Sequence, residues 1–96
     1  MNITQSLRTG WQIGRLQSEL KDLATLGTKK RKRMEHLRTQ IARLVHQAEV
    51  MRIADYGAAE RIEQEAAEAE AWLVQAHERA AQIHAKIAEL KGGQHG

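Results

Sequence analysis

The spacing of apolar residues constrains this chain more than any other feature. Apolar positions recur at alternating steps of three and four residues, which is the seam pattern of a coiled coil. The three series are Ile13, Leu16, Leu20 and Leu23; then Met34, Leu37, Ile41, Leu44, Ala48 and Met51; and then Ile62, Ala66, Ala69, Leu73, Ala76, Ala80, Ile83, Ile87 and Leu90. The sequence therefore predicts an all-α fold held together by long, narrow helix contacts.

The composition agrees with helices and limits the size of the core. Ala, Leu, Glu, Gln, Lys and Arg dominate the 96 residues, and Pro, Cys and Phe are absent. Without Cys, neither a disulfide nor a thiolate zinc site can form. The longest apolar run is the four residues 71–74, whereas a membrane span needs about twenty. We therefore expect no membrane span and no signal peptide, and a cytoplasmic location.

The strongest turn signal lies at residues 26–28. Gly27 suits the left-handed position after a helix end, and the Thr28 hydroxyl can cap the next helix. This assignment divides the chain into an N-terminal helix and turn (1–28), a long basic-then-acidic helix (29–91) and a disordered tail (92–96).

The predicted fold is an antiparallel coiled-coil helical hairpin. Its second helix is expected to be kinked or broken near Gly57, where the apolar spacing changes. The alternative is a three-helix bundle, with separate helices at 29–56 and 58–91.

A reversal at residue 27 leaves the apolar stripe of residues 58–91 without a partner from the first helix. Burying a large aliphatic side chain contributes about 1.5–3 kcal/mol, so a second copy or a larger protein is expected to cover the stripe. Trp72 is the expected centre of that interface, because Trp is enriched among residues that dominate binding. The candidate interface residues are Ile62, Trp72, Leu73, Ile83, Ile87 and Leu90.

Charge is segregated along the chain. Residues 29–54 carry eight basic and two acidic side chains, and residues 55–96 carry four basic and eight acidic ones. If a helix begins at Thr28, five consecutive cations occupy its first turns, where each is unfavourable by about 0.3–1 kcal/mol. This placement suggests an external anion such as phosphate. The candidate anion-binding residues are Lys29, Lys30, Arg31, Lys32, Arg33, Arg38 and Arg43.

Two other interpretations of the basic run stay open. It can be a solvated face that keeps the protein soluble. It can also face the Glu-rich stretch of a second, antiparallel chain, in which residue i would lie opposite about residue 100 − i. In that register Arg33 lies beside the glutamates between residues 60 and 70.

No catalytic or metal-binding arrangement is recognisable. Ser6 and Ser18 are the only serines, and His77 and His84 stand two helical turns apart, about 10 Å along the axis, which is too far to share a metal ion. We expect no enzyme activity, no cofactor, no metal and no small-molecule substrate. The predicted function is a non-enzymatic helical interaction module (adaptor, assembly or inhibitory protein) that self-associates through its coiled-coil face. The alternative is a nucleic-acid-binding accessory protein that uses the basic run.

Overall fold

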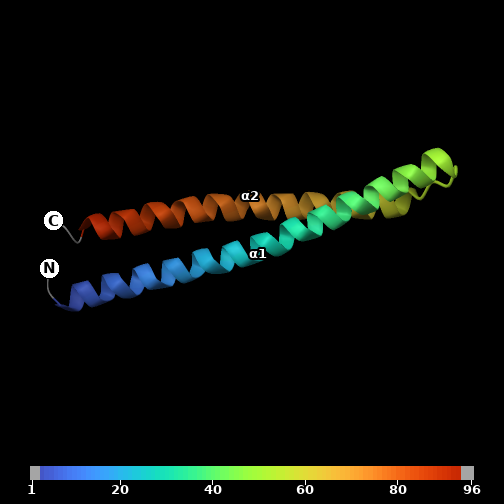
Figure 1. The fold of residues 1–96 in the computed structure, drawn as a ribbon. Helices are drawn as coiled ribbons and strands as arrows, with labels where there is room; N and C mark the ends of the chain where they lie inside the picture. The colour runs from blue at the N-terminus through green and yellow to red at the C-terminus, as the bar shows by residue number, and fades with distance from the viewer. Residues whose placement is uncertain (1–2, 94–96) are drawn as a thin grey trace. The chain divides into compact units, whose positions relative to one another are not determined.

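The computed structural model describes residues 3–93, which form two helices. Helix α1 spans Ile3–Val50 and helix α2 spans Tyr56–Gly93, and residues 51–55 connect them (Figure 1). The predicted all-α helical hairpin is confirmed, with the break placed just before Gly57. The three-helix alternative is wrong, because the described residues contain two helices.

The turn expected at residues 26–28 is also wrong, because α1 runs through it without interruption. Gly27 is buried and has an ordinary helical φ. From Leu23 to Met34 is eleven residues, so steps of four, three and four through Gly27 and Lys30 keep one seam in phase. A glycine inside a helix costs about 1 kcal/mol relative to Ala, and the packing along the continued seam exceeds this cost.

The chain reverses at residues 51–55 through specific backbone interactions. The N–H groups of Met51 and Ile53 both donate to the Gln47 carbonyl at 3.1 Å, which closes the last turn of α1. The Asp55 carboxylate then accepts a hydrogen bond from the Ala58 N–H at 3.0 Å and caps α2. Between them Arg52 has a φ of 56°, a left-handed conformation that costs a residue with a Cβ about 1–2 kcal/mol.

Replacing Arg52 by glycine is expected to stabilise the hairpin. Glycine removes the left-handed strain but makes the unfolded chain more flexible, so we expect the free energy of unfolding to rise by about 0.5–1 kcal/mol. Urea denaturation followed by circular dichroism measures the change. The matched control is Arg61→Gly inside α2, which should lower the stability by about 1 kcal/mol. A destabilising Arg52→Gly would contradict the turn conformation.

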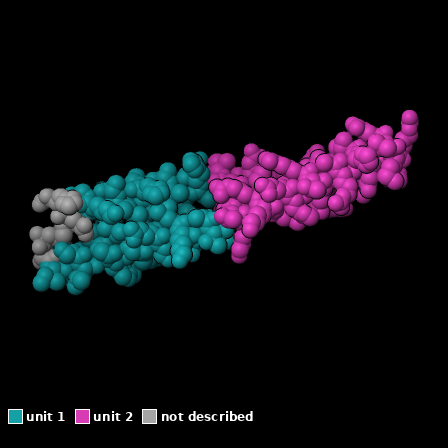
Figure 2. Space-filling model, viewed as in Figure 1, with its two compact units in different colours: residues 1–26, 75–96 teal, residues 27–74 magenta. Residues whose placement is uncertain are grey.

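The hairpin comprises two compact units (Figure 2). Unit 1 combines α1 up to Leu26 with α2 from Gln75, and unit 2 runs from Gly27 to Val74. Within each unit the α1 segment lies antiparallel to the α2 segment (Figure 1). The most buried large side chains are Ile83 in unit 1 and Leu37 in unit 2, each 1% exposed. Each unit is therefore held by a single narrow apolar seam.

The ion pairs across the seam give the register of both units. Glu19 pairs with Arg79 in unit 1, and Arg33 pairs with Glu65 in unit 2. Both pairs of residue numbers sum to 98, so residue i of α1 lies opposite about residue 98 − i of α2. In this register α1 covers the apolar stripe of residues 58–91, and the expectation that this stripe lacks a partner within the chain is wrong.

The C-terminal boundary differs from the sequence-based prediction as well. Gly92 and Gly93 belong to α2 rather than to a disordered tail. The rest of the predicted tail, residues 94–96, lies outside the described residues.

Candidate interaction surfaces

The residues predicted to form a protein interface lie mainly in the hairpin's own seam. Ile83 and Ile87 are buried in unit 1. The other four residues are half-buried: Ile62, Trp72, Leu73 and Leu90. Because α1 continues through Gly27, it occupies the face that a second molecule was expected to cover.

Trp72 packs against a lysine of the same unit. The Lys30 amine lies 5.8 Å from the centroid of the Trp72 ring, and both side chains are half-buried. Lys30 occupies a seam position that an apolar residue would normally take. Its aliphatic stem can pack there while the amine reaches the ring, an arrangement that combines partial burial with a cation–π contact. Trp72 therefore contributes to the packing within unit 2.

Arg33, a candidate phosphate ligand, is engaged by a carboxylate. Its Nε and Nη2 donate to the Glu65 carboxylate oxygens at 2.7 and 3.0 Å. This bidentate hydrogen bond lowers the pKa of Glu65 and raises the pKa of Arg33. The 98 − i register places the basic segment opposite the Glu-rich segment of the same chain. The basic-to-acidic pairing that one interpretation of the sequence placed between two chains thus occurs within one chain.

The lowered pKa of Glu65 predicts a pH dependence of stability. A carboxyl whose pKa is lower in the folded state than in the unfolded state stabilises the fold while it is ionised. This contribution is present above the usual Glu value of 4.5 and disappears as the pH falls through the lower folded-state value. We expect Glu65→Gln to reduce the acid-induced drop in the urea midpoint. The control Glu68→Gln, at an exposed position, should behave like the wild type, and identical profiles for all three proteins would refute the role of Glu65.

Part of the basic run remains exposed to solvent. Within residues 3–93, five of its side chains are exposed and make no ion pair: Lys29, Arg31, Lys32, Arg38 and Arg43. Unit 2 as a whole carries nine basic and eight acidic residues, a net charge of only +1. The strong positive charge visible in the sequence is thus largely balanced by the acidic residues of the same unit.

A cluster of apolar side chains is exposed where the chain reverses. We call Val50, Met51, Ile53 and Tyr56 the turn cluster; each is more than half exposed. Beside it lies a cavity of about 170 Å³, lined by Tyr56 and by apolar residues that include Ile41, Leu44 and Val45. Connecting segments are usually polar, so this cluster is a candidate contact surface. Sequence reasoning missed it, because Val50, Met51 and Ile53 were assigned to the interior of a helix and Tyr56 to a kink or break in it.

A second exposed cluster lies at the start of α1 in unit 1. We call Ile3, Leu7 and Trp11 the N-terminal cluster; their exposures are 79%, 70% and 62%. The Arg15 guanidinium carbon lies 5.0 Å from the centroid of the Trp11 ring. The sequence signal was present but lay off the seam, since the three residues repeat every four positions on another face of the helix.

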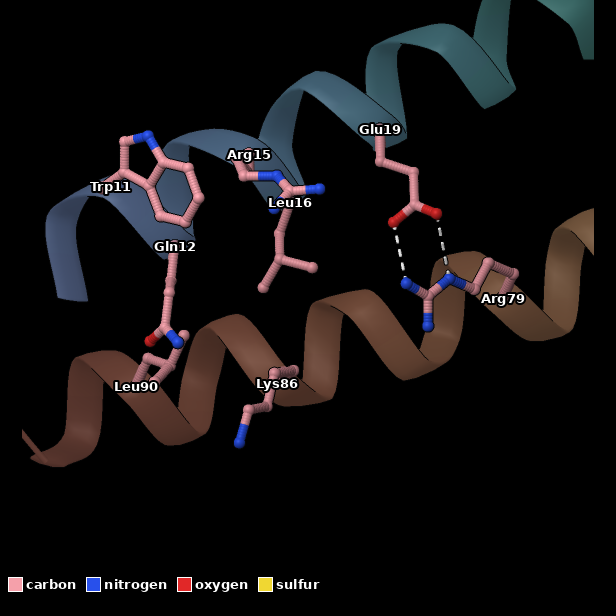
Figure 3. A pocket seen from close by; sticks show the side chains of 8 residues that line it. All are labelled: Trp11, Gln12, Arg15, Leu16, Glu19, Arg79, Lys86 and Leu90. Carbon is pink, nitrogen blue, oxygen red and sulfur yellow. Dashed lines mark hydrogen bonds and ion pairs between the residues drawn. The ribbon is translucent and has the colours of Figure 1, made fainter. Parts of the chain in front are cut away.

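A groove next to Trp11 combines apolar and charged walls (Figure 3). Its volume is about 360 Å³, and it lies between the first part of α1 and the last part of α2. Arg79 closes one side by donating two hydrogen bonds, of 3.1 and 2.9 Å, to the Glu19 carboxylate, which raises the pKa of Arg79. The remaining lining residues are Gln12, Arg15, Leu16, Lys86 and Leu90.

Comparison with known proteins assigns no family to this arrangement. The chain matches no protein-family model, no curated protein and no solved structure at a significant level. Among residues 3–93, no three His, Asp or Glu side chains come together as a metal site. In the same part of the chain, no helix is both long and apolar enough to cross a bilayer.

Proposed function

We propose that this protein is a non-enzymatic interaction module that binds partner proteins through apolar side chains outside its own seam. The observation that carries the proposal is the turn cluster, in which four large apolar side chains are exposed: two in the connecting segment, where polar residues are usual, and one at each adjoining helix end. Contiguous exposed apolar surface commonly marks a binding site in soluble proteins. The coiled-coil seam itself is occupied by the hairpin, so the contact surface differs from the one that the apolar periodicity predicted.

The proposal is tested by comparing what the wild-type chain and a turn-cluster variant capture. The variant carries Met51→Gln and Ile53→Thr, and the matched control carries Leu26→Gln, another exposed apolar residue. Each tagged chain is incubated with a nuclease-treated extract at high salt, after circular dichroism has shown that it is folded. Proteins retained by the wild type and the control but lost by the variant support the proposal. The same set of proteins on all three chains contradicts it.

A second candidate function is non-specific binding of nucleic acid. It is favoured by the five exposed side chains of the basic run that make no ion pair within the described residues. Such binding is carried by phosphate contacts and weakens steeply with salt. A labelled duplex titrated at low and at high salt tests it, with Lys29→Gln, Lys32→Gln and Arg43→Gln combined in one variant. No binding by the wild type at about 50 mM salt would exclude this candidate.

A further inference from the structure

The N-terminal cluster is left exposed by the part of the chain that the structure describes. Its three side chains are 62% exposed or more, although they share one face of α1. The contact between Trp11 and Arg15 covers only part of one ring. Burial of this face would be favourable, and the hairpin leaves it open.

Two glycines extend the same face and indicate what kind of surface fits it. Ile3, Leu7, Gly10 and Gly14 follow each other at steps of four, three and four. A Cβ built on either glycine would meet nothing within 4 Å, so the hairpin does not require glycine at these positions. Small residues at such spacing allow a second helix backbone to approach closely. A helix is therefore a better occupant of this face than a flat surface.

The charges beside the cluster select an acidic partner. Residues 3–18 contain Arg8 and Arg15 and no Asp or Glu. The first acidic residue of the chain, Glu19, is already paired with Arg79. An acidic helix would complement the two arginines, whereas a basic one would be repelled.

The outer face of α2 in unit 2 has the required chemistry. Ala67, Ala71 and Val74 are exposed there at steps of four and three. Residues 62–78 contain five Glu and neither Lys nor Arg. Glu68, one of these five, and Glu60, just before them, are exposed and make no ion pair within the described residues. The side chains along the middle of this face are small and apolar, and those at its sides are acidic. The small side chains fit the glycines beside the N-terminal cluster, and the glutamates fit its arginines.

We propose that the N-terminal cluster of one chain docks onto the Ala67–Val74 face of α2 in a second copy. This inference rests on the proposed interaction function and names one partner, the protein itself. Glycines on one helix and alanines on the other bring the two backbones close together. Leu7 and Trp11 supply the apolar contact, and the arginines lie beside the glutamates of the other chain.

Sedimentation velocity of the full chain over a concentration series tests the proposal. The wild type is expected to associate reversibly. Trp11→Ala, and separately the double variant Gly10→Gln with Gly14→Gln, should each weaken association at least tenfold. Gln is a better helix former than Gly, so the second variant should keep or raise the melting temperature of the hairpin while it loses the contact. The control Gly92→Gln, also at an open position, should leave association unchanged.

Charge reversal tests whether the partner is a second copy. A chain with Arg8→Glu and Arg15→Glu, and a chain with Glu60→Arg and Glu68→Arg, should each associate weakly alone. An equimolar mixture of the two should recover association, because one pairing of faces is complementary again. Failure of the mixture to recover would overturn the proposed pair of faces.

The remaining outcomes separate this inference from the proposed function. A wild type that stays monomeric at the highest concentration overturns self-association, whereas the capture experiment on the turn cluster still decides the proposed function. If the monomer binds anionic phospholipid vesicles and Trp11→Ala abolishes that binding, the cluster serves a membrane surface and the inference is wrong. The inference is equally wrong if the Arg8 and Arg15 reversal removes a captured protein while the wild type remains monomeric.

Discussion

Truncation of Leu37 to alanine is expected to lower the free energy of unfolding by about 2–4 kcal/mol. Leu37 is 1% exposed and lies in a seam that is formed by only two helices. Replacing a buried leucine by alanine costs about 2–5 kcal/mol, depending on how far the cavity can collapse. Two helices have more freedom to close together than a layered core has, so we expect the loss to lie in the lower part of that range. Urea denaturation at one low protein concentration measures it.

The matched control for this truncation is Leu7→Ala, which removes the same atoms from a side chain that is 70% exposed. It should change the stability of the monomer by less than about 0.5 kcal/mol. Ile83→Ala makes the corresponding test in unit 1, where Ile83 is 1% exposed, and should resemble Leu37→Ala. Equal losses for Leu7→Ala and Leu37→Ala would contradict the assigned seam.

Apolar periodicity predicted the fold class and much of the core correctly. Leu37, Ile83 and Ile87 all belong to series with steps of three and four, and all three are buried. The prediction succeeds because the 3.6-residue period of a helix determines the spacing of its buried side chains along the sequence. No tertiary information is needed to read it.

Of the two breaks that the sequence indicates, at Gly27 and near Gly57, the reversal was assigned to the wrong one. Gly27 and Thr28 carry the usual signals of a helix end, whereas residues 51–55 contain neither Gly nor Pro. The local penalty at Gly27 is about 1 kcal/mol, which the packing of a longer seam outweighs. The eleven-residue interval from Leu23 to Met34 was the available signal, because it keeps both halves of α1 in one phase.

The incorrect position predicted for the reversal led to the incorrect prediction of the interface. With a turn at residue 27, the apolar stripe in the second half of the chain has no partner, and neither do its charges. With the turn at residues 51–55, Arg33 meets Glu65 within the same chain. The two exposed clusters were missed for different reasons. Ile3 and Leu7 lie on another face of the helix than the apolar stripe. Met51 belongs to the stripe and was therefore assigned to a helix interior.

Repairing the two weak seam positions should stabilise the hairpin by about 2 kcal/mol. In the double variant Gly27→Ala with Lys30→Leu, the first change restores helix propensity worth about 1 kcal/mol. The new Cβ at position 27 would lie 3.7 Å from the nearest atom, the Arg31 Nη1, which is an ordinary contact. The second change adds half-buried apolar surface and removes the cation–π contact with Trp72. We expect a net gain of about 1 kcal/mol from it, because a cation–π contact between side chains that solvent still reaches contributes only about 0.5–1 kcal/mol.

Single variants separate the two contributions. Gly10→Ala, at an open position outside the seam, should reproduce the propensity gain of Gly27→Ala, whereas Lys29→Leu, at an exposed position, should leave the stability nearly unchanged. If Lys30→Leu instead lowers the urea midpoint, the lysine over Trp72 stabilises unit 2 by more than an apolar residue could. Midpoints raised by Gly27→Ala and by Lys30→Leu, but not by Lys29→Leu, would show that Gly27 and Lys30 weaken a continuous helix. These two residues also explain why its continuity was not recognised in the sequence.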